Sequence, residues 1–175
     1  MKTLPLPLIL SALALSACGA ITTNGSYEPV PAGYTGPVAT LADSGLEESP
    51  TTAQIFAVVA VDGQAVSNSF FTTAEAKGKA GYDFSRSLVQ RRVPVRAMKL
   101  KLKASHNVTD AKEAMMNLVK GRPSTLVEGE VDFTPRANAR YVVRGELLQS
   151  GSTVWVEDAT TRQPVTAKVK GSSGD

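Results

Sequence analysis

Alternation between apolar and charged residues in two segments, 95–104 and 127–133, constrains the fold of this chain more than any other feature. A period of two places successive side chains on opposite faces of a β-strand. Each segment therefore predicts a strand with one face buried and the other in water, as in an antiparallel sheet. The charged positions are Lys99, Lys101 and Lys103 in the first segment and Glu128, Glu130 and Asp132 in the second.

Other short segments also predict strands. Residues 55–61 are continuously apolar and rich in β-branched side chains, which is typical of a strand buried on both faces. The Asp62-Gly63 pair that follows is a hairpin turn signal. A polar segment, residues 158–163, predicts the turn of a second hairpin. The predicted strands are residues 55–61, 64–69, 95–104, 127–133, 140–148, 153–157 and 164–169.

One segment has the spacing of a helix. Asp110 is expected to cap its N-terminus with Glu113 three residues later, and Gly121 and Pro123 end it. Six to eight strands with one short helix near residues 110–120 predict a mainly β fold, an antiparallel β-sandwich. The order of elements resembles transthyretin-like and immunoglobulin-like sandwiches, an analogy at the level of the fold that says little about function.

Composition excludes several classes of protein. The 175 residues suffice for about one domain, and 42% are hydrophobic, which is enough for a packed core. A single cysteine and a single histidine exclude a disulfide within the chain and a metal site built from several His or Cys residues. A net charge of +3 is too small to indicate a nucleic-acid-binding protein.

The N-terminus has the three parts of a secretory signal peptide. Lys2 precedes an apolar run, residues 4–15, and small residues follow. The run is shorter than the roughly 20 residues that a helix needs to span a membrane. Residues 1–17 are therefore expected to direct export and to be removed.

The end of this segment, Leu15-Ser16-Ala17-Cys18, resembles the lipobox of bacterial lipoproteins. The resemblance implies that the Cys18 thiol receives a diacylglycerol group and that cleavage falls between Ala17 and Cys18. The family often retains proteins at the inner membrane through an Asp after the cysteine. Gly19 stands there in this chain, which favours a lipid anchor in the outer membrane, facing the periplasm.

The mature chain is expected to contain three parts. Residues 18–36 are rich in Gly, Pro, Ser and Thr and predict a lipidated flexible linker, in which Tyr27 and Tyr34 are either an interaction motif or incidental. Residues 37–170 are expected to form the sandwich, and residues 171–175 a disordered tail.

Residues 85–104 contain seven cations and no acids. Six of these form a candidate patch for anionic ligands: Arg91, Arg92, Arg96, Lys99, Lys101 and Lys103. A basic patch of this kind would bind lipid headgroups or an acidic glycan. The same residues are also compatible with a solvated strand face, or with pairing of the lysine stripe against the acidic stripe on a neighbouring strand.

Catalytic signatures are missing from the chain. His106 is the only histidine and is expected to lie in a loop after a strand, and no G-x-S-x-G motif occurs. The spacing of Glu128, Glu130 and Asp132 follows strand alternation rather than a calcium loop. We therefore expect a non-enzymatic protein without a metal or cofactor.

Residues 141–165 resemble the closing part of small proteobacterial lipoproteins of uncharacterised function, which end in a tyrosine-bearing strand and a hairpin containing V-W-x-E-D. Arg162 departs from the glycine that would suit a tight turn there. We expect a lipid-anchored binding or assembly module in the periplasm, with an envelope protein or an anionic glycan or lipid as partner. The alternatives are an accessory envelope hydrolase, an enzyme inhibitor, or a self-assembling structural lipoprotein in which Trp155 is a contact.

Overall fold

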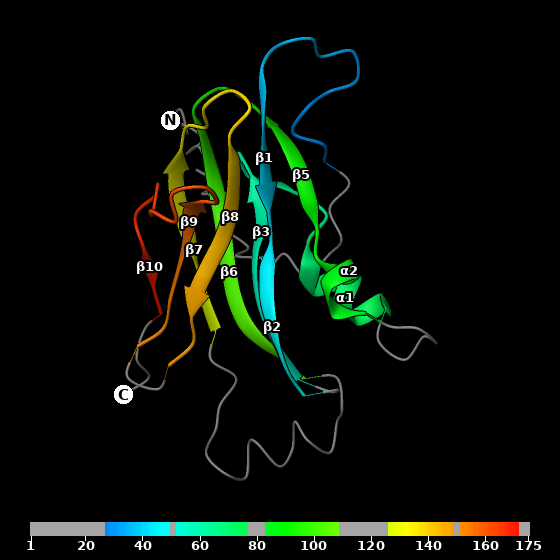
Figure 1. The fold of residues 1–175 in the computed structure, drawn as a ribbon, viewed down its shortest axis with the longest axis vertical. Coiled ribbons are helices and arrows are strands. Elements are labelled where there is room, and N and C mark those ends of the chain that lie inside the picture. Colours follow the sequence, from blue (N-terminus) through cyan, green and yellow to red (C-terminus); the bar gives the residue numbers. More distant parts are fainter. Residues whose placement is uncertain (1–26, 50–51, 77–82, 109–125, 149–150, 172–175) are drawn as a thin grey trace, which may run out of the picture.

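The computed structural model describes residues 27–49, 52–76, 83–108, 126–148 and 151–171, and in these ranges the chain forms two sheets packed face to face (Figure 1). The first sheet has the strand order β10-β9-β8-β1-β5, and the second has the order β2-β3-β6-β7, with β4 beside β3. The strands of the first sheet are β1 (Val38–Ala42), β5 (Gln90–Pro94), β8 (Arg140–Glu146), β9 (Thr153–Asp158) and β10 (Val169–Lys170). Those of the second are β2 (Ser44–Ser49), β3 (Thr52–Val61), β4 (Gln64–Ala65), β6 (Met98–Val108) and β7 (Leu126–Phe133).

The prediction of a mainly β, mostly antiparallel sandwich is confirmed. Every pairing between named strands is antiparallel except that of β1 with β8, which is parallel. The helix expected near residues 110–120 lies outside the described residues. Two helices that the sequence analysis did not predict, α1 (Ser69–Ala76) and α2 (Phe84–Ser87), lie to one side of the sandwich (Figure 1).

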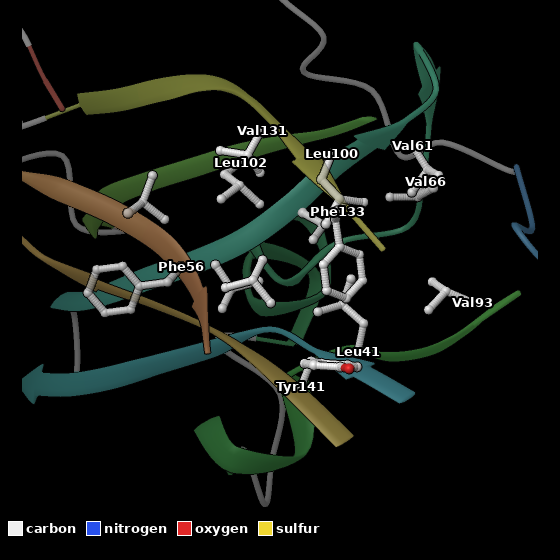
Figure 2. Close-up of a cluster of buried hydrophobic side chains, with 14 of the residues drawn as sticks. Leu41, Phe56, Val61, Val66, Val93, Leu100, Leu102, Val131, Phe133 and Tyr141 are labelled. Atoms are coloured by element: carbon white, nitrogen blue, oxygen red, sulfur yellow. The ribbon is translucent and has the colours of Figure 1, made fainter. Parts of the chain in front are cut away.

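The core lies between the two sheets. Leu41 of the first sheet and Leu100 and Leu102 of the second are fully buried, as the alternation in residues 95–104 predicts. Figure 2 shows the aromatic rings of Phe133 and Tyr141 among these side chains, and they meet edge to face with their centroids 5.0 Å apart. Such pairs add about 0.5–1.5 kcal/mol to the free energy gained by burial alone.

Strand β3 is buried on both faces, as its continuous apolar run predicts. One face, with Phe56, packs in the core of the sandwich, whereas the other, with Ile55, packs against Phe84 of α2. A register shift between Val58 and Ala60 places an extra residue in the strand. Because this β-bulge resets the alternation, both Val58 and Val61 face the core.

The Asp62-Gly63 turn is confirmed, but the return strand is shorter than predicted. Asp62 and Gly63 both have positive φ, 49° and 78°. Positive φ at both central residues is what a type I′ turn in a two-residue hairpin requires. Strand β4 covers only Gln64–Ala65 of the expected residues 64–69. The chain then leaves the sheet and forms α1, which starts at Ser69 and packs against the second face of β3.

The second hairpin and the single histidine also differ from expectation. The return segment after β9 makes one bridge, Glu157 with Pro164, and pairs again only at β10.

His106 lies within β6 rather than in a loop, because this strand continues beyond the alternating segment and pairs with β3. Its Nε2 lies 3.5 Å from Glu48 Oε1.

The lysine stripe and the acidic stripe face each other on neighbouring strands. The register of β6 and β7 sets Lys99 opposite Asp132, Lys101 opposite Glu130 and Lys103 opposite Glu128. Lys99 Nζ lies 3.0 Å from Asp132 Oδ1, and the hydrogen bond between them raises the lysine pKa. Lys101 Nζ lies 2.5 Å from Glu128 Oε1, on the diagonal. Of the three interpretations of this stripe, internal pairing is the one that the register bears out.

Reversal of all three lysines of the stripe to glutamate is expected to lower the free energy of unfolding, because like charges then lie directly opposite across the ladder. A further variant that also changes Glu128, Glu130 and Asp132 to lysine should recover most of the loss, since it restores opposite charges in the same register. Urea unfolding of the three proteins measures both effects. Equal stability of the two variants would contradict the pairing.

Candidate functional site

The six cations of the predicted anionic-ligand patch do not form one surface. Arg91 and Arg92 are neighbours on β5 and therefore point to opposite faces of the first sheet, Arg91 inward and Arg92 into solvent. Arg96 lies beyond β5, where its Nη2 is 2.6 Å from Asp62 Oδ2. The three lysines lie on the outer face of the second sheet. The six cations, which are close together in the sequence, therefore lie in four separate places in the structure.

Arg91 belongs to a buried ion pair with Asp43. Its Nη1 and Nη2 donate to the two carboxylate oxygens at 2.8 and 3.0 Å, and the two side chains are 5% and 0% exposed. Asp43 also accepts hydrogen bonds from Val58 N at 3.1 Å, from Ser69 N at 3.0 Å and from Ser69 Oγ at 2.9 Å. Arg91 Nη2 donates in addition to the Ser67 carbonyl at 3.0 Å. All the hydrogen-bonding capacity of the carboxylate is therefore used within the protein.

This pair lies where the chain passes from one sheet to the other. Asp43 separates β1 of the first sheet from β2 of the second, and its N–H donates to the Val89 carbonyl at 2.9 Å. Its partners come from β3, from the start of α1 and from β5. One carboxylate thus ties three elements to the corner between β1 and β2, which indicates a structural rather than a ligand-binding role for Arg91.

Replacement of Arg91 by methionine is expected to lower the free energy of unfolding by about 3–5 kcal/mol, because it leaves the Asp43 carboxylate buried without a counter-charge. The matched control is Arg92→Met on the adjacent, exposed position, where a change within about 0.5 kcal/mol is expected. Guanidinium unfolding of both variants provides the measurement. Similar losses in the two would show that the buried pair is not what stabilises this corner.

The outer face of the first sheet carries a hollow of about 270 Å³. It lies over β1, β8 and the ends of β5 and β9, and the two helices do not cross this part of the sheet (Figure 1). The lining residues are Thr40, Ala42, Gln90, Arg140, Tyr141, Val142, Arg144, Glu157, Ala159 and Arg162.

The strand register explains why the surface is hollow. Thr40 pairs with Arg92 on one side and with Arg140 on the other, so that the three residues form a row across β5, β1 and β8. Adjacent strands are about 4.8 Å apart, which places the two arginine Cα atoms about 10 Å from each other. In the next row, Ala42 lies between Gln90 and Val142. The floor therefore consists of short side chains on β1, between longer side chains on its neighbours.

The hollow has an excess of positive charge. Three arginines line it, and the one acid, Glu157, lies with its Oε1 3.7 Å from Arg144 Nε. Arg140 and Arg162 make no ion pair with any residue that the structure describes, and neither does Arg92 beside them. Arg140 and Arg144 were not predicted as binding residues from the sequence, and Arg162 was noted there only for its place in a turn. The first two could have been found from their alternation with Tyr141 and Val143, whose side chains are buried.

Arg162 is held in place by a tight turn built on Asp158. The Asp158 Oδ1 accepts hydrogen bonds from the Thr160 and Thr161 N–H groups at 2.9 and 3.1 Å, and Arg136 Nη2 donates to Oδ2 at 2.7 Å. These backbone bonds, with a smaller contribution from Arg136, lower the pKa of Asp158. Arg162 N donates to the Asp158 carbonyl at 2.8 Å, and its φ is 58°, in the region that favours glycine.

The acid dependence of stability is expected to change in the Asp158→Asn variant. The folded pKa of Asp158 lies below the unfolded value of about 3.9, so its carboxylate contributes stability above that pH and loses it as the pH falls through the folded pKa. The variant lacks this titration, and its stability should therefore fall less than that of the wild type below about pH 4. Thermal unfolding between pH 6 and pH 2 tests this, and parallel curves would contradict it.

Trp155 does not form an exposed contact surface. Trp155 is on β9, where it lies opposite Arg144 of β8, and it is only 8% exposed. Lys168 Nζ lies 4.0 Å from the centre of its ring. Among the described residues, no group of three or more His, Cys, Asp or Glu side chains is arranged to hold a metal ion. The described helices are also too short or too polar to cross a membrane.

Comparison with protein-family models, with curated proteins and with solved structures finds no match to this chain.

Proposed function

We propose that this protein is a lipid-anchored lipoprotein of the outer membrane that acts in the periplasm as a non-enzymatic binding or assembly module. The observation that carries the proposal is Cys18, the only cysteine, at the end of Leu15-Ser16-Ala17-Cys18 after a short apolar run. Two or three acyl chains give stable attachment, whereas one chain gives only marginal attachment.

The start of the described chain supports a short tether. Tyr27 packs against the core of the sandwich, and its N–H donates to the Ala65 carbonyl at 3.3 Å. The second half of the segment expected to be a linker, residues 27–36, thus belongs to the described body of the protein. Residues 19–26 between Cys18 and Tyr27 can span at most about 30 Å when fully extended. A lipid on Cys18 would therefore keep the sandwich close to the membrane surface.

The binding role is supported by the arginine-lined hollow. The lysine stripe is neutralised by the acids of β7, whereas the arginines of the hollow exceed the acids that line it. An open surface with unneutralised arginines favours an anionic partner, such as the glycans and lipids of the cell envelope.

The Cys18→Ser variant is expected to lose its membrane attachment, because serine has no thiol to form the thioether with diacylglycerol. The wild-type protein should remain in the membrane fraction after washing with high salt, and mass spectrometry should show an acylated Cys18 at its N-terminus. Asn24→Ser is a matched control in the same segment and should behave as the wild type.

Two results would contradict the proposal. One is a Cys18→Ser variant that remains with the membrane after the salt wash, or a wild-type protein with an unmodified thiol. The other is turnover of an envelope substrate by the purified wild-type protein, which would contradict the non-enzymatic role while leaving the anchor in place.

A further inference from the structure

We infer that the arginine-lined hollow of the first sheet binds a phosphate group, with Arg140 and Arg162 as its main ligands. This inference names a ligand class for the binding role proposed above and rests on that role, although it does not depend on the lipid anchor. The site differs from the patch that the run of cations in residues 85–104 suggests. Of the cations in that run, only Arg92 lies beside the hollow, opposite Thr40.

The charge of the hollow fits a phosphate group. Three arginines and one glutamate line it, which gives a formal charge of +2, and Arg92 adds a further cation in the same row as Thr40 and Arg140. A phosphomonoester carries close to two negative charges at neutral pH, whereas a carboxylate carries one. The charge of the lining therefore matches a phosphate better than a single carboxylate.

The hydrogen-bond donors of the hollow also fit a phosphate group. Guanidinium groups present planar pairs of N–H donors that fit phosphate oxygens, and Arg140 and Arg162 have no partner among the described acids that would compete for these donors. Thr40 and Gln90 provide neutral donors at the floor and the rim. Three oxygens of one phosphate could thus be bound from β1, β8 and the turn after β9 at the same time.

The size of the hollow suits a small phosphorylated ligand. The short side chains of Thr40 and Ala42 leave about 270 Å³ between the longer side chains around them, which is enough for one phosphorylated headgroup or sugar but small for a larger ligand. Arg162 reaches this space from a backbone position with φ of 58°, where glycine would be under less strain. An arginine at such a position is an outlier of the kind that gathers at binding sites.

The test measures binding of inorganic phosphate and of glycerol 3-phosphate to the full mature chain in detergent, by calorimetry and by amide shifts of residues 40–42 and 162. Arg140→Gln and Arg162→Gly are each expected to lower the affinity about tenfold, as loss of a charge-assisted hydrogen bond does. Ala42→Leu, which fills the floor without a change of charge, should lower it similarly. Lys103→Gln removes one cation from the other sheet and should leave the affinity within twofold of the wild type.

Arg162→Gly separates binding from folding. Because glycine suits the left-handed backbone, this variant should unfold at the same or a higher temperature than the wild type while binding phosphate more weakly. Vesicles with phosphatidic acid, compared with vesicles of phosphatidylglycerol and with soluble glycerol 3-phosphate, distinguish a lipid headgroup from a free phosphorylated ligand. Tighter binding of phosphatidic acid vesicles than of the other two ligands identifies a lipid headgroup as the ligand. Equal binding of phosphatidic acid and soluble glycerol 3-phosphate identifies a soluble phosphorylated ligand.

Three outcomes would overturn the inference. They are no saturable binding of phosphate by the wild type, equal affinity of the wild type and the three hollow variants, and binding of acetate or glucuronate as tightly as phosphate. If membrane attachment through Cys18 is intact in the same preparation, each of these outcomes rejects the phosphate site alone. Conversely, phosphate binding by a protein that is not acylated would reject the anchor and retain the site.

Discussion

The buried ion pair between Asp43 and Arg91 is the interaction on which the arrangement of the two sheets depends. It lies at the residue where one continuous stretch of chain leaves the first sheet and enters the second. The Asp43 carboxylate accepts five hydrogen bonds at this corner, from donors on β3, on α1 and on β5. Arg91 and Arg92 are neighbours on β5, so the strand that supplies Arg91 to this pair also places Arg92 beside Thr40 on the outer face.

The two outer faces of the sandwich handle their charge in different ways. On the second sheet, lysines and acids alternate in register on β6 and β7, so that the charges are matched across the ladder. On the first sheet, arginines flank the short residues of β1, and the acids nearby are fewer than the arginines. A count of cations along the chain cannot distinguish these faces, because what matters is the charge on the neighbouring strand. This difference is the reason why the proposed anionic ligand is assigned to the first sheet.

The parts of the fold that could be predicted are those encoded by local pattern. The alternation in residues 95–104 and 127–133 identified β6, β7 and the buried face of each, and Asp62-Gly63 identified the hairpin after β3. Strands β1, β2 and β5 were not predicted, because they are short and mix polar with apolar residues, so that only their pairing makes them strands. Helix α1 was not predicted for a related reason. It is short, and its packing against the second face of β3 is a tertiary contact that the local sequence does not show.

The sequence by itself determined which side of each alternating strand is buried, because a period of two gives the face without any knowledge of the neighbours. The proposed lipobox is likewise a local pattern, since Leu15-Ser16-Ala17-Cys18 is recognised without reference to the folded domain. Only the tertiary structure decided that Arg91 lies inside and Arg92 outside, beside Thr40, and that Arg140, Arg144 and Arg162 line one hollow. These residues come from three separate parts of the chain, and they are brought together by hydrogen-bonded ladders whose partners no local pattern specifies.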